Sequence, residues 1–553
     1  MTRPSVLLTT LVLVCATATG TRADAQADRG VSRITSQEID AHLRFLASDL
    51  LEGRAPATRG GDLTEQYIAS ELESFGVRPG VGDSSYFQRV PIDVVKSDPA
   101  TIRVTASGKA TANLRSTEDV VVFPGSATAS SAARGELVFV GYGVSAPEYK
   151  WDDFKGTDVR GKILLVLVND PPATAAEPNL FGGNAMTYYG RWTYKYEEAE
   201  RRGAAGMLIV HTTERAGYPW HVVVNSNSTE HRLLPRNPSL PAPLGVRGWI
   251  TDSAATALLA QAGLRMSQLR KQAESRNFRP VTTGIIVDAS MRNSLEHMSA
   301  NNIVGVVTGI DPKVRDQYVV YSAHWDHFGI GPVVNGDSIY NGAVDNASGV
   351  ASILTVAHAA AEGVKPRRSQ LFVFVTAEEA GLLGSEYFGE HPTVPASNII
   401  AALNMDVVPL NGRVRDLNVM GDNKSSLGPS LAQMLRAEGV RISPDAHPEQ
   451  GHFYRSDHFS FAKVGIPAVS IGGGDDYVGR PAGWGLQQSD DYTAHRYHQP
   501  SDEYRSDFDL RGAVQLAAIV YRFGFQLANA DTVPTWNAGA EFKAIRDSSR
   551  KTQ

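Results

Sequence analysis

Short apolar runs recur along the second half of the chain, and most are followed directly by acidic or histidine side chains. The runs lie at 302–307, 318–321, 371–375, 399–403 and 467–471. Runs of this length, bounded by Gly, Pro or polar residues, are typical of buried strands. Between them, Val350, Ile353, Leu354 and Ala357 have the spacing of one helix face. Strands that alternate with helices predict an α/β fold with a mostly parallel mixed sheet flanked by helices.

The N-terminus has the three parts of a secretory signal peptide. Arg3 gives a positive start, apolar residues follow at 6–8 and 11–16, and Ala-Asp-Ala at 23–25 fits a cleavage site. The apolar run is shorter than the roughly 20 residues of a membrane span. We therefore predict a signal peptide over 1–25 and an exported protein, periplasmic or secreted.

Composition excludes several classes of protein. The net charge is -6, which does not favour a nucleic-acid-binding surface. The single cysteine, Cys15, lies in the predicted signal peptide, so the mature chain has neither a disulfide framework nor a cysteine-rich zinc finger. After the predicted signal peptide, the sequence has no run of about 18 apolar residues. We therefore expect no membrane span in the mature chain.

Potential metal ligands gather where the predicted strands end. They are His324, Asp326, Asp345, Glu378, Glu379, Asp406 and His498. Side chains at the carboxyl ends of parallel strands meet at one edge of a sheet. Carboxylates and imidazoles held together there repel one another unless they bind a cation, and this set without thiolates suits zinc. Asp326 lies two residues beyond His324, on the same face of an extended segment, where it can orient the imidazole.

Each of these residues also has a purely structural explanation when taken alone. Asp345 can cap the following helix, and paired acids such as Glu378 and Glu379 favour a helix start. A nucleophile system is less well supported, because Ser470 lies in a sequence that only approaches the Gly-x-Ser-x-Gly elbow. The common position of the acids and histidines at strand ends favours the metal site.

The motifs together resemble the M28 family of co-catalytic zinc metallopeptidases, which includes aminopeptidases and glutamate carboxypeptidases. The shared sequences are His-x-Asp at 324–326, Asp-Asn-Ala-Ser-Gly at 345–349, Glu-Glu at 378–379, Asn-Met-Asp at 404–406 and Tyr-His-Gln-Pro-Ser-Asp at 497–502. Residues 45–61 resemble the start of exported members. The block 141–206 is similar to a protease-associated (PA) domain inserted in the peptidase.

This resemblance implies a domain organisation. We expect the signal peptide at 1–25, the N-terminal part of the peptidase at 26–110, a small β-rich PA domain at 111–290, the main catalytic part at 291–530 and a C-terminal tail at 531–553. Residues 472–496 are expected to form a loop over the pocket.

The resemblance also implies a role for each site residue. Asp345 would bridge two Zn²⁺ ions, with His324 and Asp406 completing one site. Glu379 and His498 would complete the other. Two further side chains would act in catalysis, Glu378 as general base and Tyr497 by polarising the scissile carbonyl. The Asp345–Asn346 peptide bond is expected to be cis, as it often is in the family.

The implied activity is that of an exopeptidase acting on peptide substrates, an aminopeptidase in the first instance. A metallo-carboxypeptidase or dipeptidase of the same family, a single-zinc glutaminyl cyclase and a non-catalytic binding protein are the alternatives. An aminopeptidase needs an acid for the substrate ammonium, as Asp406 or the loop 455–458 could provide. A carboxypeptidase needs a cation, for which Arg455 or Arg480 is suitable. The sequence leaves the oligomeric state open.

Overall fold

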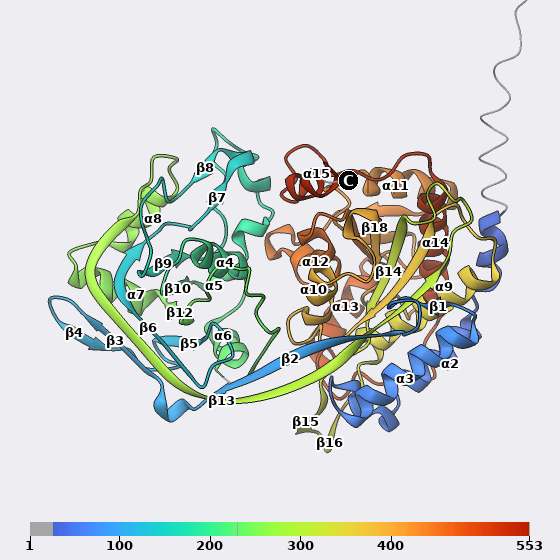
Figure 1. Ribbon diagram of the computed structural model, residues 1–553, viewed down its shortest axis with the longest axis horizontal. Coiled ribbons are helices and arrows are strands. Elements are labelled where there is room, and N and C mark those ends of the chain that lie inside the picture. Colours follow the sequence, from blue (N-terminus) through green and yellow to red (C-terminus); the bar gives the residue numbers. More distant parts are fainter. Residues whose placement is uncertain (1–25, 229, 552–553) are drawn as a thin grey trace, which may run out of the picture.

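The computed structural model describes residues 26–228 and 230–551. Two lobes are joined by the long strand β13 (Val281–Val307), which runs from one lobe into the other beside β2 (Phe87–Ser97) (Figure 1). The predicted signal peptide at 1–25 lies outside the described residues. Within the described ranges, no helix combines the length and apolar character needed to cross a membrane.

The first lobe is built on a mixed sheet with a parallel centre. Its strand order is β11-β2-β13-β17-β14-β18-β21-β19-β20, and β17, β14, β18 and β21 are parallel neighbours. The bounds are β1 (Arg78–Pro79), β11 (Glu230–Leu233), β14 (Tyr318–His324), β17 (Ser369–Val375), β18 (Ile399–Asn404), β19 (Asp416–Met420), β20 (Arg441–Ser443) and β21 (Ala468–Gly473). The hairpin β15 (Gly329–Val334) and β16 (Asp337–Tyr340) projects from this lobe (Figure 1).

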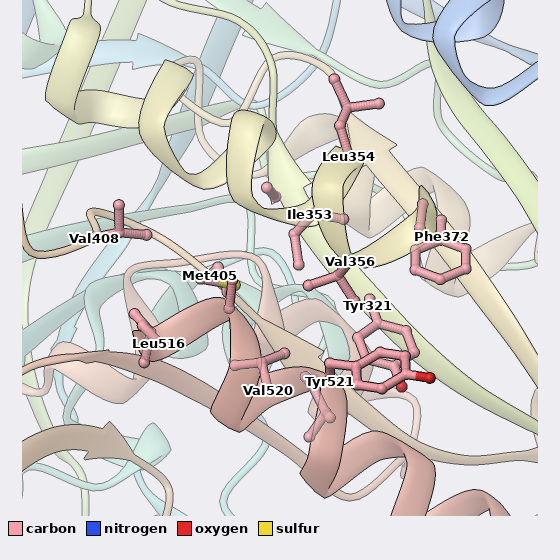
Figure 2. Close-up of a cluster of buried hydrophobic side chains, with 14 of the residues drawn as sticks. Tyr321, Ile353, Leu354, Val356, Phe372, Met405, Val408, Leu516, Val520 and Tyr521 are labelled. Atoms are coloured by element: carbon pink, nitrogen blue, oxygen red, sulfur yellow. The ribbon is translucent and has the colours of Figure 1, made fainter. Parts of the chain in front are cut away.

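Helices cover both faces of this sheet. Along β14, Val319 and Tyr321 belong to a core shared with α9 and α14, whereas Val320 belongs to a different core. Figure 2 shows Tyr321 close to Val356 of α9 and to Tyr521 of α14. The helices are α2 (Ser36–Leu46), α3 (Arg59–Ser74), α9 (Ser348–Glu362), α10 (Leu383–Glu390), α11 (Leu427–Glu438), α12 (His458–Lys463) and α14 (Arg511–Asn529). The predicted α/β fold class is confirmed.

Helix α9 follows the metal-ligand motif at 345–349 and is buried at almost every position. Its sequence is apolar or small on all sides, as expected for a helix enclosed between a sheet and other helices. Burying a residue such as Leu354 or Ile353 contributes about 1.5–3 kcal/mol each. This packing fixes the start of α9, and with it Asp345, against the edge of the sheet.

The second lobe has its own mixed sheet, in the order β4-β3-β13-β6-β9-β10-β12-β5. Its strands are β3 (Arg103–Ser107), β4 (Thr111–Asn113), β5 (Val120–Pro124), β6 (Ser130–Phe139), β9 (Ile163–Leu167), β10 (Gly206–His211) and β12 (Val246–Thr251), with the small pair β7 (Ser145–Ala146) and β8 (Trp151–Asp152). Its helices are α4 (Trp192–Arg201), α5 (Thr213–Ala216), α6 (Trp220–Asn227), α7 (Asp252–Gln261) and α8 (Met266–Ala273). The sheet begins at β3, ahead of the boundary expected at residue 111. Its assignment as a PA domain stays a prediction.

The segment expected to be a loop and the C-terminal tail both contain helices. Residues 472–496 include α13 (Trp484–His495), and the tail includes α15 (Lys543–Lys551). Helix α13 buries only Gly485, so its sequence lacks the apolar stripe that would have predicted it. Near the start of α15, Arg546 is buried and its Nη2 donates to the Ile399 carbonyl at 2.6 Å. That contact with a distant strand anchors α15.

Candidate metal centre

The register of the central strands places three motifs at one edge of the sheet. His324 at the end of β14 lies opposite Val375 at the end of β17, and Asn404 at the end of β18 lies opposite Ser322. The chain then continues into 376–379 and 405–406, so Glu378, Glu379 and Asp406 follow at that edge. His498 arrives differently, because it follows α13 and not a strand. The expectation that every ligand follows a strand is therefore wrong for His498.

The five predicted ligands meet around the Asp345 carboxylate. His324 Nε2 lies 3.2 Å from Asp345 Oδ1, and His498 Nε2 lies 3.4 Å from Asp345 Oδ2. Asp406 Oδ1 is 3.4 Å from His324 Nε2, and Glu379 Oε2 is 3.3 Å from His498 Nε2. Each oxygen of Asp345 thus faces a different histidine, with one further acid beside each. This is the arrangement expected of a bridging carboxylate, and the ligand roles themselves stay predictions.

The chemistry of this cluster fits cations. Ligand atoms of His324, Asp345 and Glu379 lie within 4.8 Å of one another, as do those of His324, Glu378 and Asp406. The His498 Nε2 atom is buried without a hydrogen bond, although it faces two carboxylates. Nitrogen and oxygen donors without thiolates form the ligand set of catalytic zinc sites. The two groups share His324, and Asp345 lies between His324 and His498, so the residues present fit a zinc site.

Burial and mutual repulsion perturb the acids at this edge. Burial is the main reason that the pKa of Glu378 lies well above its usual range, and the charges of Asp457 and Asp406 raise it further. Burial and the neighbouring Asp345 do the same to the pKa of Glu379. Burial opposes the ionisation of Asp345, but contacts with His324 and His498 hold its pKa well below the usual value. Without a cation, several of these carboxylates are costly to ionise.

Asp326 supports the site in a different way from the one expected. The Nδ1 atom of His324 lies 3.2 Å from the main-chain carbonyl of Asp326, while the Asp326 carboxylate is 3.9 Å away. That carboxylate instead accepts hydrogen bonds from the backbone N–H groups of Glu378 (3.1 Å) and Glu379 (3.4 Å). It therefore positions the segment that carries both glutamates.

Tyr497 stacks on the ring of His498, with ring centroids 3.7 Å apart. Its pKa is raised above the usual range, by burial first and then by the charges of Asp345 and Glu379. A neutral hydroxyl at this position can donate a hydrogen bond. The Asp345–Asn346 peptide bond is cis, as the resemblance implied.

Three residues that support the metal centre were not predicted from the sequence. His327 Nδ1 donates to Glu379 Oε1 at 2.6 Å. Asp502 accepts from the backbone N–H groups of Val344 (3.0 Å) and Asp345 (3.1 Å). His327 and Asp502 lie close to predicted ligands in the sequence. This proximity is the sequence feature that could have identified them.

The third missed residue, Arg54, is buried beneath the same loops. It donates to the main-chain carbonyls of Trp325 (2.8 Å) and Gly342 (3.0 Å). Burial is the main cause that lowers its pKa to about 10. These two carbonyls are 271 and 288 residues away in the sequence, so no local pattern predicts the contacts.

A cavity of about 920 Å³ opens beside the metal centre. On the side of the first lobe it is lined by Glu378, Glu379, Tyr497 and His498. On the other side it is lined by residues 191–201 and 233–247. Within the part of the chain that the structure describes, residues 472–496 do not line it, so the loop expected over the pocket is replaced by segments of the second lobe.

Residues 302–523 match the family model described as Peptidase family M28. This range includes every predicted metal ligand. The chain contains a peptidase family M28 domain. The family predicted from the motifs is confirmed by this match.

Curated relatives are similar to this chain over parts of its length. "Probable glutamate carboxypeptidase AMP1" of Arabidopsis thaliana is 24% identical over 502 residues, covering 81% of this chain and 63% of that protein. "Aminopeptidase NAALADL1" of Mus musculus is 33% identical over 131 residues, covering 22% of this chain and 16% of that protein. The chain thus spans less than two thirds of the length of these relatives.

Solved structures are also similar. An aminopeptidase from Aneurinibacillus sp. strain AM-1 is 19% identical, with a TM-score of 0.49 over 92% of this chain and 97% of that one. BSAP, a zinc aminopeptidase from Bacillus subtilis, is 18% identical, with a TM-score of 0.38 over 94% and 98%.

Proposed function

We propose that this chain is an exported two-zinc exopeptidase, an aminopeptidase that releases N-terminal residues from peptides. The observation that carries the proposal is the Asp345 carboxylate, which faces His324 with one oxygen and His498 with the other. The M28 domain supports a metallo-exopeptidase. The finer assignment is supported by relatives whose names include aminopeptidase.

We assign Asp345, His324 and Asp406 to one zinc ion, and Asp345, Glu379 and His498 to the other. When bound, two zinc ions supply Lewis-acid chemistry, which lowers the pKa of a water molecule and polarises a peptide carbonyl. His327 and Ser456 hold two of the ligands in place: His327 bonds to Glu379, and the Ser456 hydroxyl donates to Asp406 Oδ2 at 2.6 Å. Such contacts orient ligands and tune their affinity.

Glu378 is the residue left to move protons. It lies within reach of His324 and Asp406 but is not needed in either ligand set. Its raised pKa suits a carboxylate that takes a proton from the attacking water and passes it to the leaving amine. Asp326 holds its backbone, and Tyr497 places a neutral hydroxyl in the same cavity, where it can donate to the scissile carbonyl oxygen.

The proposal extends to the rest of the chain. The pattern at 1–25 supports export, and the second lobe, proposed as a PA domain, restricts access by lining the cavity. A single-zinc glutaminyl cyclase is less favoured, because the donors around Asp345 suffice for two ions. A carboxypeptidase is the second candidate, favoured by Arg455 at the cavity wall. Arg480, the other cation considered, is not among the described residues that line it.

Metal analysis with a peptide panel tests the proposal. We expect two zinc ions per chain and hydrolysis of leucine p-nitroanilide. Glu378→Gln should keep both ions and lose roughly 10²–10⁴-fold in kcat, because only proton transfer is removed. One ion per chain, or unchanged activity in Glu378→Gln, would contradict the two-zinc mechanism. Faster cleavage of an N-blocked dipeptide with a free carboxylate would assign the carboxypeptidase instead.

A further inference from the structure

The hairpin of β15 and β16 has one face against the first lobe and one face toward solvent. On the inner face, Gly329 lies so close to Ala55 that an added Cβ atom on the glycine would be 2.6 Å from the Ala55 Cβ atom. Tyr340, which pairs with Gly329, is buried. Side chains alternate along a strand, and residues paired across two strands share a face. The next pair, Ile330 and Ile339, therefore lies on the outward face.

Large apolar side chains are exposed on this outward face. Ile330 is 65% exposed, and Phe328, directly before β15, is 41% exposed. Asp337 lies two residues before Ile339 in β16, so it shares the face and gives it an acidic end. The hairpin projects from the first lobe (Figure 1). Apolar side chains exposed together in this way mark an interaction surface.

Phe328 connects the outward face to the metal centre. The centroid of its ring lies 4.6 Å from that of the predicted ligand His498 and 4.9 Å from that of His327, which bonds to Glu379. Tyr497 stacks on the same His498 ring and lines the cavity, whereas Phe328 is not among the described residues that line it. The metal centre thus has an apolar surface beside it that lies outside the cavity.

Acidic side chains gather at the other end of the outward face. Burial is the main cause that raises the pKa of Glu503, and the charges of Asp337 and Asp49 follow, so the three carboxylates are neighbours. Within the described residues, none of the three forms an ion pair with a lysine or arginine, and the nearby Arg505 pairs with Asp507 instead. Acids without a cationic partner attract a positive charge on a ligand.

From these contacts we propose that the outward face of the β15–β16 hairpin is an exosite, a second surface for the peptide substrate outside the cavity. It binds the part of the peptide that extends away from the scissile bond. An apolar side chain of the peptide packs on Phe328 and Ile330, and a lysine or arginine lies beside Asp337 and Glu503. A peptide is the favoured occupant, because a second copy of the chain or a membrane seated on Phe328 would lie directly against the metal centre.

The inference rests on the proposed exopeptidase and names its substrate class. At about 3.3 Å per residue, an extended peptide needs about four residues to reach from Phe328 to Asp337. The preferred substrates are therefore peptides of about five residues or more. They carry an apolar residue next to the cleaved bond and a basic residue about four positions farther along.

A peptide series tests both parts of the exosite. The reference is Leu-Val-Gly-Ser-Gly-Lys-amide, in which serine replaces valine in a second peptide and glutamine replaces lysine in a third. We expect kcat/KM of the reference to exceed that of the serine peptide by roughly 10-fold and that of the glutamine peptide by about 3-fold. The reversed sequences, with an acetylated N-terminus and a free carboxylate, serve if the enzyme releases C-terminal residues.

Variants separate the exosite from preferences inside the cavity. In Ile330→Ser, the ratio of kcat/KM for the valine peptide over the serine peptide should fall by roughly 5-fold or more, mainly through KM. Ile310→Ser is the matched control and should leave this ratio unchanged. Ile310 is also 65% exposed, but it follows the end of β13, at the opposite edge of the sheet from the metal centre.

The acidic end of the exosite has its own variant. In Glu503→Gln, the lysine and glutamine peptides should be cleaved with similar kcat/KM, because the charge that distinguishes them is gone. Zinc content and thermal melts establish that each variant is folded.

Equal kcat/KM across the peptide series, or a valine-to-serine ratio that Ile330→Ser leaves unaltered, would overturn the exosite. Light scattering and vesicle sedimentation test the other occupants. A dimer, or binding to phosphatidylcholine vesicles, that is lost in Ile330→Ser while the ratio stays unaltered would assign the hairpin to that partner instead.

The proposed function can fail separately. It fails if leucine p-nitroanilide and every peptide of the series remain uncleaved. Fluorescence anisotropy of the labelled reference peptide, with wild type and Ile330→Ser, then decides the exosite. Weaker binding by the variant would support it, and equal affinities would count against it.

Discussion

The two lobes share a pattern of parallel strands that end in polar residues, yet they use those residues differently. In the first lobe, β14 ends at His324, and β17 leads to Glu378 and Glu379. In the second lobe, β10 ends at His211, and β9 leads to Asp170. The positions in the sheets are comparable. The difference lies in the partners that each side chain finds.

In the second lobe the protein itself satisfies these groups. Asp170 accepts from the backbone N–H (2.8 Å) and the hydroxyl (2.9 Å) of Thr187, and His211 Nε2 lies 2.9 Å from the Tyr218 carbonyl. Buried Lys195 donates to the carbonyls of Tyr142 (2.6 Å) and Asn169 (3.0 Å). At the metal centre, by contrast, acids and imidazoles face one another, and within the described residues no Lys or Arg forms an ion pair with these acids. Strand ends bring polar side chains together in both lobes, and in the first lobe acids and imidazoles are left facing one another, as a metal site requires.

The largest expected effect is the difference between substituting Asp345 at the metal centre and substituting Asp170 in the second lobe. Asp345→Asn removes the charge shared by both proposed ions, so we expect zinc content and peptidase activity to fall to background. Asp170→Asn should keep both ions and most of the activity while lowering stability at pH 4 by about 1–3 kcal/mol, because its hydrogen bonds with Thr187 are weakened. Zinc analysis, peptidase assay and thermal melts of the two variants measure this. Equal loss of zinc in both would remove the distinction between the lobes.

The ease of prediction also differed between the lobes. His324, Asp345, Glu379 and Asp406 could be named from the sequence, because a strand or helix boundary beside each is a local pattern. The cavity wall at 191–201 could not, because α4 contacts the first lobe through residues far apart in the sequence, as in the Lys463–Glu197 ion pair. Contacts between segments far apart in the sequence leave no periodic signal.

The next effect compares two buried histidines. His327 bonds to the predicted ligand Glu379, whereas His211 bonds to the carbonyl of Tyr218. Loss of a residue that orients a metal ligand typically costs about 10–100-fold in metal affinity. His327→Gln should therefore weaken zinc binding by about that factor, and His211→Gln should leave it unchanged. Competition with a chelator gives both affinities, and similar values in the two variants would assign His327 a merely structural role.

The smallest effect concerns the pH dependence of stability in the second lobe. Burial raises the pKa of Asp170 to about 7 in the folded chain, although nearby Lys195 opposes this. The usual value in an unfolded chain is about 3.9. Between about pH 4 and 7 the folded state therefore holds a proton that the unfolded state has lost. The stability contributed by Asp170 is present below pH 4 and declines as the pH rises to 7.

Asp170→Asn lacks this titration, so the difference in unfolding free energy between wild type and variant should shrink as the pH rises from 4 to 7. Urea unfolding at several pH values, with chelator present so that zinc does not contribute, measures this difference. The other ionisable groups are common to both proteins, and their titration cancels. A difference that grows with pH would mean that Asp170 is ionised in the folded chain and paired with Lys195. The second lobe would then hold a buried ion pair between Asp170 and Lys195. It would differ from the metal centre only in that the protein itself supplies the positive charge beside the acid.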